Sequence, residues 1–160
     1  MKVSARNVFE GTVSAVQPGA VNAEVELTLG GGEKLVAVVT MASLHNLNIN
    51  VGKQAVALVK APWVVLMTDA AGYRLSARNS LEGEVLRVGD GAVNAEVVLK
   101  LSGGTEVYAI VTREAVQELG LKPGVKATAL IKASHIILGA KPDRMPLLPC
   151  PGRSGIASRC

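Results

Sequence analysis

The sequence Ser4-Ala5-Arg6-Asn7 returns unchanged as Ser76-Ala77-Arg78-Asn79, and the 72-residue offset between the copies then holds without a gap. The longest shared stretch, Gly-Ala-Val-Asn-Ala-Glu-Val at 19–25, recurs at 91–97. Pairing residues 4–67 with 76–139 gives 30 identities in 64 positions. Self-similarity at one fixed offset indicates a tandem duplication. We therefore expect a first repeat over residues 1–67, a connector over 68–75 and a second repeat over 76–139.

The pattern of apolar residues within each repeat is typical of short β-strands. Residues 20–29 alternate with period two, so that Val21, Ala23, Val25, Leu27 and Leu29 share one face. Further strands are expected over 3–16, 35–39, 55–60 and, separated by Pro62, over 63–67. Thr40 and Thr112 are expected to cap short helices over 41–47 and 113–119. This order predicts a mainly all-β fold class: two OB-type five-stranded β-barrels in tandem, each with one short helix.

Composition limits what fills the core and which partners the chain suits. The aromatic residues are only Phe9, Trp63, Tyr73 and Tyr108, so that small aliphatic side chains must form the core. Most of the formal charge of +4 belongs to residues 140–160, and the repeated body has 13 basic and 12 acidic residues. A nearly neutral body with few aromatic rings disfavours an OB-fold module that binds nucleic acid. We therefore expect no nucleic-acid partner.

Residues 140–160 contain four prolines and no periodicity, and we interpret them as a disordered or adventitious tail. The two cysteines, Cys150 and Cys160, both lie there, so the body has no disulfide framework, which suits a reducing cytosol. No run approaches the 18 apolar residues of a membrane span, and the first residues lack the apolar core of a signal peptide. The expected location is the cytoplasm, with no membrane partner.

The chain offers no arrangement of residues typical of an enzyme. Its two histidines, His45 and His135, do not occupy matching positions in the repeats, and no spacing typical of metal ligands appears. The glycine pairs lack the Lys-Ser/Thr ending of a phosphate-binding loop. We expect no catalytic residue, no metal cation site and no cofactor.

The two copies share small hydrogen-bond donors and cations instead. Ser4 and Ser76, Arg6 and Arg78, Thr40 and Thr112, and Lys60 and Lys132 recur as pairs. Such donors suit a small oxyanion, which accepts many hydrogen bonds and donates none. Taken singly, each has an ordinary explanation as a solvated strand residue, a helix cap or an edge charge. The shared Asn22 is equally explained by a bond to its own backbone. Recurrence of the set at one offset favours the oxyanion interpretation.

The repeated segments Ser-Ala-Arg-Asn and Gly-Ala-Val-Asn-Ala-Glu-Val, together with the runs Val-Val-Thr and Leu-Val-Lys-Ala-Pro-Trp, closely resemble those of the molbindins. These are small proteins that bind molybdate or tungstate and are built of Mop domains. Two fused copies resemble the di-Mop members, and the resemblance covers residues 1–139. It implies one OB-type barrel per repeat, assembly into a homotrimer, and cytoplasmic storage or homeostasis of molybdenum. The ligand would be molybdate or tungstate itself.

The resemblance also implies two classes of oxyanion site. Each interfacial site would use residues of one barrel together with residues of a neighbouring chain. The first-repeat site would combine Ser4, Ala5, Arg6, Lys60 and Ala61 with Thr40 and Ser43 of the neighbour. The second-repeat site would combine Ser76, Ala77, Arg78, Lys132 and Ala133 with Thr112 and Ala115 of the neighbour. Ala115 replaces Ser43 and removes one hydroxyl, so the two interfacial sites would differ in affinity. A further site on the three-fold axis would use Val21 and Asn22, or Val93 and Asn94.

Mop domains also occur fused to regulators and transporter components, which leaves a ligand-sensing role as an alternative. The chain has no helix-turn-helix segment and no ATP-binding loop, so it would carry only the sensing part.

Overall fold

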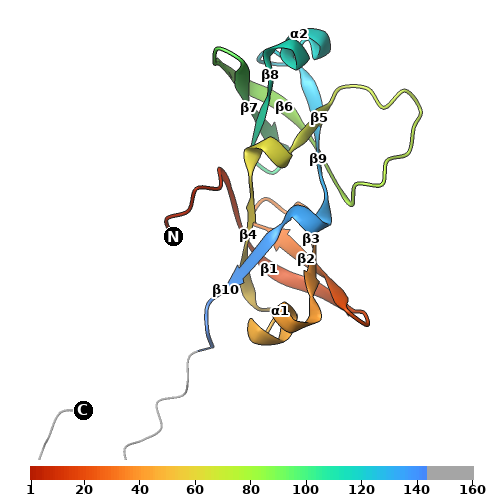
Figure 1. Ribbon diagram of the computed structural model, residues 1–160, viewed down its shortest axis with the longest axis vertical. Helices are drawn as coiled ribbons and strands as arrows, with labels where there is room; N and C mark the ends of the chain where they lie inside the picture. Colours follow the sequence, from red (N-terminus) through yellow and green to blue (C-terminus); the bar gives the residue numbers. More distant parts are fainter. Residues whose placement is uncertain (144–160) are drawn as a thin grey trace, which may run out of the picture.

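The computed structural model describes residues 1–143, which form mainly β-strands (Figure 1). The first repeat contains β1 (Asn7–Pro18), β2 (Asn22–Leu29), β3 (Lys34–Thr40), α1 (Met41–Asn46), β4 (Gln54–Val59), the 3₁₀ helix η1 (Ala61–Trp63) and β5 (Val65–Met67). The second contains β6 (Asn79–Asp90), β7 (Asn94–Leu101), β8 (Glu106–Thr112), α2 (Arg113–Leu119), β9 (Lys126–Ile131), the 3₁₀ helix η2 (Ala133–His135) and β10 (Ile137–Ala140). The same order of elements appears twice, as the duplication predicts.

The strands form two antiparallel five-stranded sheets, ordered β10-β4-β1-β2-β3 and β5-β9-β6-β7-β8. The long first strand of each repeat pairs with two partners, and its register shifts between Val13 and Ala15 in β1 and between Val85 and Arg87 in β6. An irregularity of this kind bends a strand and increases its twist, which lets each sheet curl around its own core. The predicted fold class is confirmed.

The fifth strand of each repeat pairs in the sheet of the other repeat. Val65 of β5 lies opposite Leu130 of β9, and Ile137 of β10 lies opposite Leu58 of β4. Figure 1 shows η1 and η2 near the middle of the molecule, where the chain crosses between the sheets, with α1 and α2 at opposite ends. The sequence predicts five strands per repeat but not this exchange, because side-chain alternation reports which face a strand buries and not which sheet edge it joins.

Small aliphatic residues fill both cores. Val25, Leu27 and Leu35 of the first sheet are completely buried, and so are their counterparts in the second. Phe9 is the one buried aromatic residue within residues 1–143. Burial of aliphatic side chains is therefore the main source of stability, as the composition indicates.

Two boundaries differ from the sequence-based expectation. The first strand begins at Asn7 rather than at residue 3. Val21, expected to lie within the second strand on the same face as Ala23 and Val25, precedes β2 and is 71% exposed. The cause is the turn before β2: the backbone N–H of Gly19 donates to the carbonyl of Asn22 at 2.8 Å, which leaves Val21 at the tip of the hairpin.

The C-terminal end of the described chain is tied to the first repeat. The side chain of Asn48 donates to the Asp143 carboxylate, and Lys53 Nζ lies 3.2 Å from it. These contacts lower the pKa of Asp143, the Asn48 hydrogen bond first. Residues 144–160, with Cys150, Cys160 and most of the predicted tail, lie outside the described residues.

Candidate functional site

The asparagine of the repeated motif joins the two repeats. The side chain of Asn7 donates to the backbone carbonyl of Tyr108 at 2.8 Å and accepts from its N–H at 2.7 Å. Asn79 forms the matching pair with Val36 at 2.8 and 2.7 Å and also donates to the carbonyl of Ile131. The Asn7 side chain therefore hydrogen-bonds to the backbone of the edge strand β8, and the Asn79 side chain to that of the edge strand β3, as a neighbouring strand would. Sequence reasoning missed both asparagines.

The arginine of the motif also reaches the other repeat. Arg6 donates two hydrogen bonds to the Glu96 carboxylate, at 2.8 and 3.1 Å, and its guanidinium lies 4.6 Å from the centroid of the Tyr108 ring. Arg78 donates one bond to Glu24 at 2.9 Å. The hydrogen bonds that Arg6 donates to Glu96, followed by the charge of that carboxylate, raise the pKa of Arg6. Both candidate cations are half exposed and already face a carboxylate.

The serine and alanine of the motif take part in a different feature, a cavity of about 170 Å³ where the repeats meet. Three predicted oxyanion residues, Ser4, Ala5 and Lys60, line it. The remaining lining residues are Val3, Leu58, Trp63, His135 and Ile137. We call this space the junction cavity. It combines an ammonium group and a hydroxyl with apolar walls, an arrangement typical of small-ligand sites.

The exchanged strand completes the junction cavity. Ile137 begins β10, and His135 ends η2, so two residues of the second repeat line a cavity built on the first. The His135 ring lies 4.9 Å from the Trp63 ring, centroid to centroid, with their planes at 42°. Lys60 Nζ lies 5.7 Å from the Trp63 centroid. Sequence reasoning missed His135 and Ile137 as site members, because they become neighbours of Lys60 only through the strand exchange.

Thr40 and Thr112 are confirmed as helix caps. Thr40 Oγ1 accepts from the N–H of Ser43 at 3.1 Å and donates to the Ser43 hydroxyl at 3.0 Å, and Thr112 Oγ1 accepts from the N–H of Ala115 at 3.1 Å. Both threonines are at the ends of the molecule that carry α1 and α2 (Figure 1). Within one chain they do not line the junction cavity.

The remaining predicted residues occupy three kinds of position. Ala61 and Ala133 are buried at the first positions of η1 and η2. Ser76, Ala77 and Lys132 repeat the places of Ser4, Ala5 and Lys60 in the chain, before β6 and after β9. Val93, like Val21, is highly exposed, and each precedes the asparagine that starts the next strand, Asn94 in β7 and Asn22 in β2.

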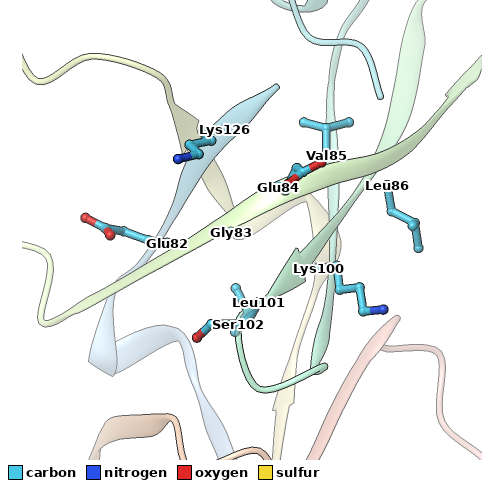
Figure 2. Close-up of a pocket in the computed structure, with 9 residues that line it drawn as sticks. All are labelled: Glu82, Gly83, Glu84, Val85, Leu86, Lys100, Leu101, Ser102 and Lys126. Carbon is cyan, nitrogen blue, oxygen red and sulfur yellow. The ribbon is translucent and has the colours of Figure 1, made fainter. Parts of the chain in front are cut away.

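A larger groove, of about 440 Å³, lies on the second repeat alone (Figure 2). Its charged lining residues are Glu82, Glu84, Lys100 and Lys126, which come from three adjacent strands. The first repeat has Thr12 and Gln54 in place of Glu84 and Lys126, and Gln54 donates to Thr12 at 2.8 Å. Because the duplication does not preserve its charges, this groove is not the repeated site.

Neither a metal cluster nor a membrane span appears in the described chain. Residues 1–143 contain no group of three or more His, Cys, Asp or Glu side chains placed to hold a metal ion. Over the same range no helix is long and apolar enough to cross a membrane, since α1 and α2 have 6 and 7 residues.

Comparison with known proteins places both repeats in one family. The TOBE domain family matches residues 3–66 and 75–138. A crystal structure of the cytoplasmic molybdate-binding protein ModG with molybdate bound is 64% identical, with a TM-score of 0.86, and the match covers 88% of this chain and all of that one. The molybdenum transport protein ModE of Herbaspirillum seropedicae is 43% identical over 143 residues, which are 89% of this chain and 53% of ModE. The molybdenum-pterin-binding protein MopA of Rhodobacter capsulatus is 45% identical over 138 residues, 86% of this chain and 52% of MopA. The chain thus spans about half the length of the curated relatives it matches.

Proposed function

The chain belongs to the TOBE-domain family as a di-Mop molbindin, two Mop-type domains in tandem, and on this premise we propose that it binds molybdate reversibly without chemical change to the anion. The 64% identity to a protein crystallised with molybdate supports the ligand. The relatives are described as binding, transport or regulatory proteins rather than enzymes, in line with the sequence-based expectation.

The junction cavity is the observation that carries the proposal. It joins Ser4, Ala5 and Lys60, which are identical in the second repeat as Ser76, Ala77 and Lys132. A hydroxyl, backbone N–H groups and an ammonium group can all donate hydrogen bonds to an anion. Charge-assisted hydrogen bonds contribute roughly 1.5–3 kcal/mol each, so a few of them offset desolvation of a dianion.

We further propose that each interfacial site is completed by a neighbouring chain in a homotrimer. Thr40 and Ser43 adjoin the start of α1, whereas Lys60 follows the far end of β4, so one chain keeps the two halves of the site apart. In the proposed trimer a second copy would supply Thr40 and Ser43 to Lys60. The same arrangement pairs Thr112 and Ala115 of one chain with Ser76, Ala77, Arg78, Lys132 and Ala133 of another.

The axial site follows from the same assembly. Val21 and Val93 are more than 70% exposed, with Asn22 and Asn94 next to them. Exposed valines at hairpin tips suit contact with other copies of the chain. Three copies of one tip around a three-fold axis would frame an oxyanion with backbone amides.

For the cellular role we propose cytoplasmic storage or homeostasis of molybdenum, with tungstate as a second ligand. A regulatory role stays the alternative, because the relatives include the transcriptional regulator ModE of Yersinia pestis, which is 33% identical over 139 residues. A gel shift with DNA tests this alternative directly: no shift at moderate salt supports storage, and a molybdate-dependent shift supports regulation.

Native mass spectrometry of the full-length protein, with molybdate and with sulfate, tests the main proposal. We expect a trimer that gains several molybdates and no sulfates. Because both anions are tetrahedral dianions, the selection between them would depend on the size of the binding cavity. A monomer with unchanged mass in either anion would contradict both the ligand and the assembly.

A further inference from the structure

The guanidinium group of Arg6 has two separate contacts with the other repeat, one with a carboxylate and one with an aromatic ring. It donates two hydrogen bonds to Glu96, at 2.8 and 3.1 Å, and its central carbon lies 4.6 Å from the centroid of the Tyr108 ring. Bidentate bonding to a carboxylate and stacking on an aromatic face are both typical of the planar guanidinium group. Together they keep the Arg6 side chain against β7 and β8.

The Tyr108 ring is anchored at its backbone and at its hydroxyl. The Asn7 side chain exchanges two hydrogen bonds with the Tyr108 backbone. The Tyr108 hydroxyl donates to Glu106 at 3.1 Å and accepts from Arg87 at 3.3 Å. The Arg87 guanidinium also lies 5.8 Å from the ring centroid. Arg6 therefore packs on a ring whose own position is fixed by neighbouring residues.

The equivalent arginine of the second repeat has a different neighbour. Arg78 donates one hydrogen bond to Glu24, at 2.9 Å, and the position equivalent to Tyr108 is occupied by Val36. The Val36 backbone still exchanges two hydrogen bonds with the side chain of Asn79. The two copies thus share the backbone contact and the arginine–glutamate pair, and they differ in the aromatic ring.

Arg6 is held away from the cavity that the start of its own motif lines. Ser4 and Ala5 line the junction cavity together with Lys60, whereas Arg6 is not part of the lining within the described residues of one chain. Its side chain is 52% exposed, so solvent and solutes can reach it. Contacts at exposed positions are weak enough to be exchanged for contacts with an anion. To reach an anion in the cavity, the guanidinium group would have to give up its contacts with Glu96 and the ring.

We propose that Tyr108 is a positioning residue that holds Arg6 against Glu96 and thereby weakens molybdate binding at the first-repeat sites. The inference rests on the proposed function and deepens it, because it names a residue that distinguishes the two classes of interfacial site. At the second-repeat sites Arg78 is next to no such ring, since Val36 takes its place. A cation–π contact at an exposed position corresponds to about two- to fivefold in affinity.

Calorimetric titration of the full-length protein with molybdate, in a Lys132→Ala background, tests the assignment. The Lys132 change weakens the second-repeat sites, so the titration reports on the first-repeat sites. In this background Tyr108→Val, which introduces the residue of the first repeat, should strengthen molybdate binding about two- to fivefold. Tyr108→Phe keeps the ring and should retain the affinity of its parent. Tyr73→Val, a change at an exposed tyrosine of the connector, is the matched control and should also have no effect.

Val36→Tyr, in a Lys60→Ala background, is the reciprocal test on the second-repeat sites. A ring placed beside Arg78 should weaken molybdate binding there by about twofold. A tyrosine with a purely structural role would not give opposite changes in affinity for the two exchanges. Loss of Tyr108 would then lower the melting temperature and weaken binding as well.

The ligand-free protein provides a second readout by NMR. The Arg6 Nε–H donates to Glu96 at 3.1 Å, and it should exchange with water faster in Tyr108→Val than in the wild type or in Tyr108→Phe. Should Tyr108→Val fail to fold, Tyr108→Leu, which is closer in volume, takes its place. Unchanged or weaker molybdate binding in the folded variant, or a gain in Tyr108→Phe as large as in Tyr108→Val, would overturn the assignment alone. A wild type that takes up no molybdate would overturn the proposed function, and this role of Tyr108 with it.

Discussion

Arg6 and Glu96 are 90 residues apart in the sequence, yet two hydrogen bonds, of 2.8 and 3.1 Å, join them across the two repeats. Arg78 and Glu24 form the matching pair with one bond of 2.9 Å. The arginine of the repeated motif thus serves the contact between repeats, and its carboxylate partner competes with any anion for the same guanidinium group.

Replacing Glu96 with glutamine should strengthen molybdate binding at the first-repeat sites by up to about fivefold. The change removes a negative charge that both engages Arg6 and repels a dianion, and exposed pairs of this kind are worth up to about 1 kcal/mol. Calorimetry measures the dissociation constant. Glu118→Gln, an exposed residue of α2, is the control and should leave affinity unchanged. Weaker binding in Glu96→Gln would mean that Arg6 needs its partner in order to hold the anion.

Replacing Lys60 with alanine should weaken the first-repeat sites by about 10- to 100-fold, the loss of one charge-assisted hydrogen bond. The ammonium group lines the junction cavity and is exposed, so the fold should survive, with a circular dichroism spectrum like that of the wild type. Lys2→Ala removes a nearby exposed charge outside the cavity lining and should have little effect. Unchanged affinity and stoichiometry in Lys60→Ala would remove this lysine from the site.

Replacing Asn7 with alanine should destabilise the protein by about 2–4 kcal/mol. Asn7 is 1% exposed, and its loss leaves the N–H and carbonyl of Tyr108 without their partner, each at about 1–3 kcal/mol. Chemical denaturation provides the free energy of unfolding. Asn46→Ala, at an exposed position of α1, should lie within about 0.5 kcal/mol of the wild type. A similar small effect in Asn7→Ala would show that the contact between repeats does not depend on the motif.

Replacing Ser14 with alanine should raise the pKa of Glu26 towards its ordinary value of 4.5. The Ser14 hydroxyl donates to the carboxylate at 2.8 Å and is the main cause of the lowered pKa, ahead of Lys34. Because that pKa is lowered in the folded state, the stabilisation is present above pH 4.5 and is lost as the pH falls through the folded-state value. NMR titration of the Glu26 carboxyl measures the change. Thr12→Ala, next to Gln54, should leave it unaltered.

The local features of the fold could be predicted from the sequence, and the contacts between repeats could not. The Thr40 cap and the β2 alternation depend on neighbours within a few residues. The pairing of Arg6 with Glu96 and the place of His135 depend on which sheet takes each fifth strand, and alternation carries no information on that choice.

Asn7 is an intermediate case. It alternates with the buried Phe9 on the core face of β1, and a polar residue at a core position indicates a buried hydrogen bond. That signal was present in both copies. Its partner, the backbone of Tyr108, could not be predicted from the sequence, because any edge strand offers the same N–H and carbonyl groups.

The exchange of β5 and β10 makes this chain an internal domain swap, in which two protomer-like halves are joined through residues 68–78, the segment between β5 and β6. A tether of this length holds the halves at an effective concentration in the millimolar range, so their pairing no longer depends on how much protein the cell contains. A proteolytic cut in this segment would leave the two halves associated, because each contributes a strand to the sheet of the other.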